Sequence, residues 1–124
     1  MTAVSDIPIA PDVLDPDVAV LPLPDVAERL GLPVTRVHQM LRDGQLLAMR
    51  RDGLVVVPAD FLSGAAVVKG LTGTITLLRD ASYSAEEILR WLFTAEDSLP
   101  GTPIGALRSD RGREVKRRAQ AMGF

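Results

Sequence analysis

The sequence predicts a mainly α-helical protein that carries one small β-hairpin and ends in a bundle of helices. Three observations lead to this fold class: two short helical patterns meet at Gly31, an Asp52-Gly53 pair separates two runs of β-prone residues, and most of residues 63–124 has helical periodicity. With 124 residues, the chain is long enough for one core with a small helical unit added, but too short for two domains of typical size.

Residues 1–20 are expected to form a disordered acidic tail. They contain no basic residue, and their small apolar side chains follow no sustained period, so they cannot bury enough surface to offset the entropy of ordering them. Thr2 and Ser5 in this tail would be accessible to a kinase. The prolines and acids of the tail are Pro8, Pro11, Pro16, Asp6, Asp12, Asp15 and Asp17.

Residues 23–30 are predicted to form the first short helix. Pro24 fits its first turn, because the N–H group that proline lacks would have no partner inside the helix at that position. Gly31 is expected to end the helix, since glycine readily adopts the left-handed backbone conformation that closes many helices.

Residues 33–42 are predicted to form a second helix, with Pro33 at its start. Val34, Val37 and Leu41 recur at helical spacing and are expected to face inward. The Asp43-Gly44 pair should end this helix.

A β-hairpin is predicted to follow. Residues 46–50 and 54–57 are both rich in β-prone side chains, and an Asp-Gly pair between two such runs is a strong signal for a tight hairpin turn. Pro58 closes the second strand.

Residues 63–124 are expected to form a C-terminal helical domain. Glycines interrupt its beginning, so the first firm helix is expected from about Leu71. Ser84 and Glu87 form a capping box that opens another helix, and Thr102-Pro103 begins a short one. A basic last helix would turn three apolar side chains inward, namely Val115, Ala119 and Met122.

The spacing of Ala27, Gly31 and Val37 is that of a helix-turn-helix. Its two helices cross steeply, so the crossing needs a small side chain, the turn needs a residue that tolerates positive φ, and the second helix needs an apolar anchor. We therefore predict a winged helix-turn-helix domain over residues 21–62. In such a domain the outer face of the second helix is free to enter a DNA major groove.

The exposed side chains of this region have the chemistry that DNA recognition needs. Arginine offers a two-pronged donor to guanine or phosphate, glutamine pairs with adenine, and threonine bonds phosphate or touches a thymine methyl group. The candidates on the second helix are Thr35, Arg36, His38, Gln39 and Arg42. Arg50 and Arg51 are expected at the wing, where they would contact the DNA backbone or a minor groove, whose negative potential favours arginine.

Several segments resemble a known family. They are LGLP at 30–33, VHQMLRDG at 37–44, LLAMR at 46–50, ILRWLFT at 88–94 and REVKRRAQAM at 113–122. The first three look like the winged helix-turn-helix of excisionase-like and MerR-like DNA-binding proteins. With the last two, the chain resembles a small actinobacterial family in which such a domain precedes a family-specific C-terminal helical domain. The resemblance implies a DNA-binding, regulator-like protein without enzymatic activity. Pro33 departs from the pattern, because many relatives place a capping Ser or Thr there.

The charge distribution is more favourable to DNA than the net charge of −2 suggests. Without the four acids of residues 1–20, the chain has 14 basic and 12 acidic residues. Residues 108–124 alone hold six basic residues against Asp110 and Glu114. The part of the chain expected to fold is therefore slightly basic.

Composition excludes several other functions. The chain has no cysteine and one histidine, so thiolate zinc sites and multi-histidine metal sites are excluded. No phosphate-cradling glycine loop or catalytic serine or threonine with a nearby base is present, and we predict neither an enzyme nor a cofactor. The apolar runs are too short to span a membrane and no secretory signal is evident, so a cytoplasmic protein is expected.

These observations predict a double-stranded DNA-binding protein that acts as a transcriptional regulator. Helix 33–42 would read the major groove, and the wing at residues 50–53 would contact a flanking groove. One copy makes few contacts, so a homodimer or a larger complex is expected to bind tightly. The alternative is a protein-interaction module, antitoxin-like or a scaffold subunit, that binds a partner through its C-terminal helices.

Overall fold

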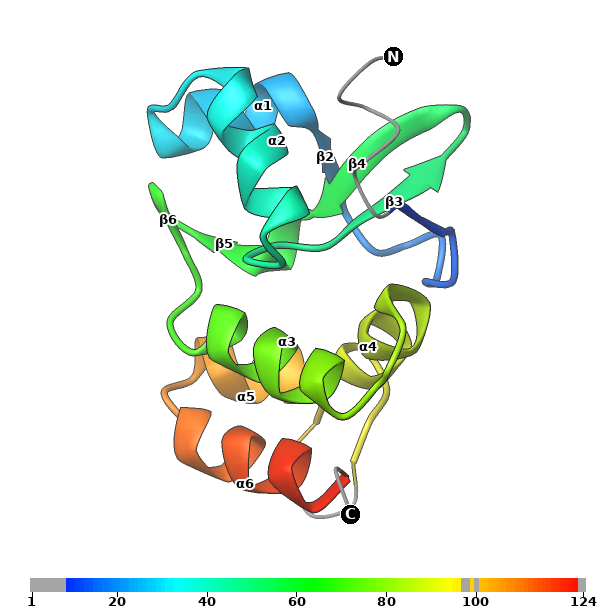
Figure 1. Cartoon of the computed structure of the whole chain (residues 1–124), viewed down its shortest axis with the longest axis vertical. Coiled ribbons are helices and arrows are strands. Elements are labelled where there is room, and N and C mark those ends of the chain that lie inside the picture. The colour runs from blue at the N-terminus through cyan, green and yellow to red at the C-terminus, as the bar shows by residue number, and fades with distance from the viewer. Residues whose placement is uncertain (1–8, 97–98, 100, 123–124) are drawn as a thin grey trace.

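The computed structural model describes residues 9–96, 99 and 101–122. Two helices and a sheet form one end of the molecule, and four helices form the other end (Figure 1). The described residues are thus mainly helical with a small β-sheet, and the predicted fold class is confirmed.

The sheet has four strands rather than the two of the predicted hairpin. The strands are β1 (Ile9–Pro11), β2 (Val20–Pro22), β3 (Ala48–Arg51) and β4 (Leu54–Pro58). Their order is β1-β3-β4-β2, with β1 parallel to β3 and the other neighbours antiparallel. The hairpin strands are therefore the inner pair, and each is flanked by a three-residue strand from the N-terminal segment.

The expectation of a disordered tail up to residue 20 is wrong for residues 9–20. This segment supplies β1, the loop that follows it and the start of β2, and its side chains Ala10 and Leu14 are buried in the core. Pairing with β3 and β4 supplies the interactions that offset the entropy cost of ordering this segment. The apolar side chains of the segment alone are too few to offset that cost. Thr2, Ser5 and Asp6, which belong to the same predicted tail, lie outside the described residues.

The helix-turn-helix consists of α1 (Leu23–Leu30) and α2 (Val34–Arg42). Gly31 ends α1 with a φ of 67°, and the Leu32 N–H donates to the Ala27 carbonyl across the turn. Ala27 and Val37 are both buried, as the motif requires. Val34 was expected to face inward, and this is wrong: the side chain is 38% exposed. As the first residue of α2, it leans toward the open end of the helix.

The wing turn has the predicted geometry. Asp52 and Gly53 adopt φ values of 52° and 80°, so both central residues are left-handed, as a two-residue hairpin turn with the natural strand twist requires. Arg51 and Leu54 face each other across the ladder immediately before and after this turn.

The C-terminal part contains a short hairpin and four helices. The elements are β5 (Leu62–Ser63), β6 (Ala66–Val67), α3 (Leu71–Asp80), α4 (Ala85–Leu92), α5 (Pro103–Arg108) and α6 (Gly112–Met122). The capping box of α4 is present, with the Ser84 N–H donating to Glu87 at 2.8 Å and the Glu87 N–H donating to the Ser84 hydroxyl at 3.2 Å. The hairpin β5–β6 was not predicted, and the boundary expected between residues 62 and 63 falls inside β5.

The two ends of the molecule share one hydrophobic core. Phe61 is fully buried in the 3₁₀ turn η2 (Ala59–Phe61), and its ring lies 5.8 Å from that of Phe93, just after α4. The Arg108 guanidinium donates to the backbone carbonyls of Asp60 and Leu62, on both sides of Phe61. The helix-turn-helix and the C-terminal helices are therefore packed together as one unit.

Candidate nucleic-acid interface

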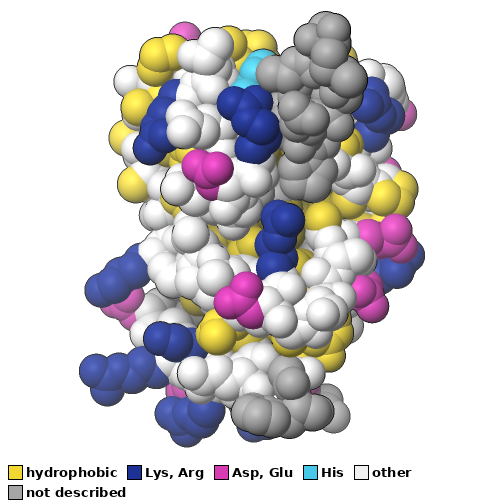
Figure 2. Space-filling view, in the orientation of Figure 1, with side chains coloured by type: hydrophobic (Ala, Val, Ile, Leu, Met, Phe, Trp, Pro, Cys, Tyr) yellow, Lys and Arg dark blue, Asp and Glu magenta, His cyan; other side chains and the backbone are white. Residues whose placement is uncertain are grey.

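Helix α2 presents a polar face to solvent. Thr35, Arg36, Gln39 and Arg42 are exposed, and His38 is half-buried beside them. The structure thus brings together all five candidates of the second helix on one side of α2. Figure 2 shows the histidine beside Lys and Arg side chains at this end of the molecule.

The opposite face of α2 holds the helix in place. Val37 and Leu41 are fully buried and Met40 is nearly so, which anchors the helix on α1 and in the common hydrophobic core. No side chain caps the start of α2, because Pro33 occupies the N-cap position. The backbone N–H groups of the first turn therefore have no side-chain partner. They lie at the positive end of the helix dipole, where an anion is stabilised.

The electrostatics of α2 favour a negatively charged partner. The helix carries two arginines and no acid. The Arg36 Nη1 donates to the Gln39 amide oxygen at 3.2 Å, so two candidate side chains hold each other on the exposed face. This contact restricts the guanidinium before any partner arrives, which lowers the entropy cost of binding.

The wing places its two arginines differently. The Arg50 side chain is exposed on β3 and is available to a partner. Leu54, on the far side of the turn, is 57% exposed, which makes it the most exposed large apolar side chain among the described residues. Leu54 and Val34 are the two exposed large apolar side chains of the described residues, and the sequence did not indicate either.

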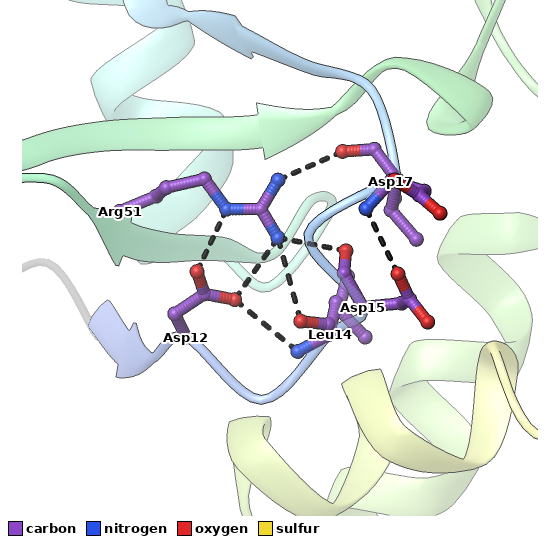
Figure 3. Close-up of polar contacts among 6 residues, drawn as sticks. Asp12, Leu14, Asp15, Asp17 and Arg51 are labelled. Carbon is purple, nitrogen blue, oxygen red and sulfur yellow. Dashed lines mark hydrogen bonds and ion pairs between the residues drawn. The ribbon is translucent and has the colours of Figure 1, made fainter.

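Arg51 is held by the N-terminal segment instead of facing outward (Figure 3). Its Nε and Nη2 donate to the two carboxylate oxygens of Asp12 at 2.7 and 3.1 Å. Its Nη1 donates to the Val18 carbonyl at 2.8 Å, and Nη2 also reaches the Asp15 carbonyl at 3.1 Å. The side chain is only 13% exposed, so the expectation that Arg51 is a free DNA contact is not supported by its position.

The contact between Arg51 and Asp12 fixes the loop from β1 to β2 against the wing. The hydrogen bonds from Arg51 lower the pKa of the Asp12 carboxyl below its ordinary value, and the Leu14 N–H, which donates to the same carboxylate, acts in the same direction. A lowered pKa means that the contact stabilises the fold above the pKa that Asp12 has in the unfolded chain. This contribution is lost as the pH falls through the folded-state pKa.

Substitution of the two neighbouring wing arginines should therefore affect different properties: stability for Arg51 and DNA binding for Arg50. Arg51→Ala is expected to lower the free energy of unfolding by about 1–3 kcal/mol, because it removes a two-pronged ion pair and leaves carbonyl groups unpartnered. Arg50→Ala should leave stability within about 0.5 kcal/mol. If the exposed side chain contacts phosphate, as the sequence predicts, this substitution also lowers the salt dependence of DNA binding by about one phosphate contact. Urea unfolding and a DNA titration of both variants check this, and the reverse pattern would show that the two roles are exchanged.

The geometry defines the class of protein. A helix with a solvated polar face on a buried apolar support, followed by a two-stranded wing, is the arrangement of a winged helix-turn-helix protein. Residues 6–62 match the family model described as "DNA-binding protein Rv2175c, wHTH domain", and residues 68–123 match the "Rv2175c C-terminal domain of unknown function".

A curated relative and a solved structure agree with these matches. The chain is 46% identical over 137 aligned residues to the DNA-binding protein Rv2175c of Mycobacterium tuberculosis (strain ATCC 25618 / H37Rv), which covers 100% of this chain and 94% of the relative. The NMR structure of Rv2175c is similar with a TM-score of 0.87 and 46% identity, over 96% of this chain and 90% of the other. The chain belongs to the Rv2175c family, and the predicted membership of an actinobacterial winged helix-turn-helix family is confirmed.

Two further findings concern other kinds of site. No three His, Asp or Glu side chains of the described residues are grouped so that they could hold a metal ion. None of the described helices is long and apolar enough to cross a membrane.

Proposed function

We propose that this chain binds double-stranded DNA and acts as a transcriptional regulator, with α2 in the major groove and the β3–β4 wing beside a flanking groove. The observation that carries the proposal is the exposed face of α2, which has two arginines and no acid and stands on a buried apolar support. The family description and the name of the relative, both of which say DNA-binding protein, support it.

The individual side chains fit separate parts of this task. Arg36 and Arg42 offer bidentate donors to guanine or phosphate, and Gln39 matches the edge of adenine. Thr35 and His38 lie on the same side of α2 and fit phosphate or base edges. Arg50 is the wing cation that we assign to the flanking groove, and Arg51 is assigned to holding the wing in shape. The proposed role is binding without catalysis, at the nucleoid in the cytoplasm.

Tight binding is proposed to need more than one copy of the chain. A single winged helix-turn-helix domain buries little DNA surface, and helix-turn-helix proteins commonly bind two half-sites as dimers. A homodimer or a partner protein bound through the C-terminal helices would supply the second copy or the additional contacts.

A fluorescence titration of the full chain with random-sequence duplex, at about 50 and about 200 mM salt, tests the proposal. We expect binding that weakens steeply as salt rises, because Lys and Arg side chains release counterions from the phosphates. A duplex affinity that is absent at the lower salt concentration would contradict the proposal.

A further inference from the structure

A basic cleft of about 570 Å³ lies in the C-terminal part, between the start of α3, the turn from α5 to α6, and α6 itself. Its cationic lining residues are Lys69, Arg111, Arg113, Lys116 and Arg117. Leu107 forms an apolar part of the wall, and Asp110 and Glu114 are its acids. The DNA contacts proposed for α2 and the wing use none of these residues.

Most of the positive charge in the cleft is uncompensated. Arg111 pairs with Glu114 at 3.7 Å. Within the described part of the chain, no ion pair joins any of the other four cations to an acid, and Asp110 is the one acid left to oppose them. A concave surface with a net positive charge concentrates anions, because the low-dielectric walls focus the field.

The backbone of α3 adds to this potential. The ten-residue helix begins at Leu71, and its N-cap residue Gly70 has no side chain to cap it. The Thr72 hydroxyl donates to the Gln45 carbonyl and not to the helix start. A Cβ added at Gly73 would meet nothing within 4 Å, so the first turn is open on this side. Uncapped N–H groups at a helix start stabilise an anion in the same sense as the surrounding cations.

The cations continue beyond the cleft. Arg118 lines a neighbouring depression together with Arg117, so basic side chains follow α6 over successive turns. Figure 2 shows Lys and Arg side chains gathered at the end of the molecule that holds α6. An extended row of cations fits a ligand with regularly repeated negative charges better than a ligand with one phosphate.

The position of this row separates it from the first interface. Helices α2 and α6 lie at opposite ends of the longest axis of the molecule, with α3 between them (Figure 1). The two basic surfaces are therefore separate, with α3 lying between them. We propose that the cleft and the basic side chains of α6, namely Arg113, Lys116, Arg117 and Arg118, bind the phosphate backbone of a second DNA segment, so that one chain bridges two duplexes. This inference rests on the proposed function of α2 for the first duplex.

A capture assay tests the bridging. One duplex is fixed to beads, the full chain is added at about 50 mM salt, and retention of a second, fluorescent duplex is measured. The cleft variant Lys116→Ala/Arg117→Ala is compared with the control variant Arg79→Ala/Arg90→Ala, which removes the same charge at exposed positions outside the cleft. Thermal unfolding checks that both variants are folded. Size-exclusion chromatography checks that they keep the oligomeric state of the native chain, so that loss of a dimer is not mistaken for loss of the second DNA site.

We expect the native chain and the control variant to retain the second duplex, and the cleft variant to retain about tenfold less, while its affinity for a single duplex changes far less. Failure of the native chain to retain it would overturn the inference. Equal retention by the cleft variant would also overturn it, because self-association of the chain would then be the cause. Failure of the proposed function would be seen separately, as unchanged single-duplex affinity after substitution of α2.

Discussion

The double variant Arg36→Ala/Arg42→Ala is expected to bind duplex DNA about 2–6 kcal/mol more weakly than the native chain. Each arginine that reads a base contributes about 1–3 kcal/mol, and the two lie at different turns of α2, so their losses should add. Both side chains are exposed, so the free energy of unfolding should change by no more than about 0.5 kcal/mol. A fluorescence titration at constant salt gives the affinity, and urea unfolding gives the stability.

The control variant Arg79→Ala/Arg90→Ala separates position from charge, because it also removes two positive charges. We expect its single-duplex affinity to stay close to that of the native chain. Titrations with several duplex sequences divide the effect further: loss of a base contact flattens the preference among sequences, and loss of a phosphate contact weakens all of them alike and reduces the salt slope. Equal losses in the two double variants would mean that α2 has no special place in binding.

The second large effect is expected at the junction of the two ends of the molecule. Phe61→Ala should lower the free energy of unfolding by about 3–5 kcal/mol, since a fully buried ring is removed and a cavity remains. A domain of this size is stable by only about 5–15 kcal/mol, so this loss is a large share of the total. Urea unfolding of the full chain measures it, and Phe61→Leu, which keeps most of the apolar volume, should cost clearly less.

The same experiment tests whether the shared core makes the molecule cooperative. Trp91, the single tryptophan, reports on the C-terminal helices, and His38, the single histidine, reports on α2. We expect the fluorescence of Trp91 and the imidazole resonances of His38 to change at the same urea concentration. Two separate transitions would show that the ends unfold independently and that Phe61 does not couple them.

The sequence predicted the elements whose signals are local. Gly31, the Asp52-Gly53 turn and the Ser84 capping box each act through neighbouring residues, and the structure confirms all three. The buried face of α2 also follows from local spacing, apart from Val34 at the helix start.

The features that the sequence did not predict depend on distant contacts. Strands β1 and β2 have three residues each and end in proline, so they have too little alternation to be recognised and form only because β3 and β4 are present to pair with them. The role of Arg51 depends on Asp12, which lies 39 residues away. An arginine in a wing is chemically suited to DNA, and only the folded arrangement shows that its donors are already occupied.

The most direct test of the account is NMR of the labelled full chain during titration with less than one equivalent of a short duplex. Direct contact changes the backbone amide shifts of the residues that touch DNA. The account predicts the largest changes in residues 34–42 and next in residues 50–54, with those of 85–92 almost unchanged. Shifts that are confined to the C-terminal helices and leave α2 unaltered would contradict it.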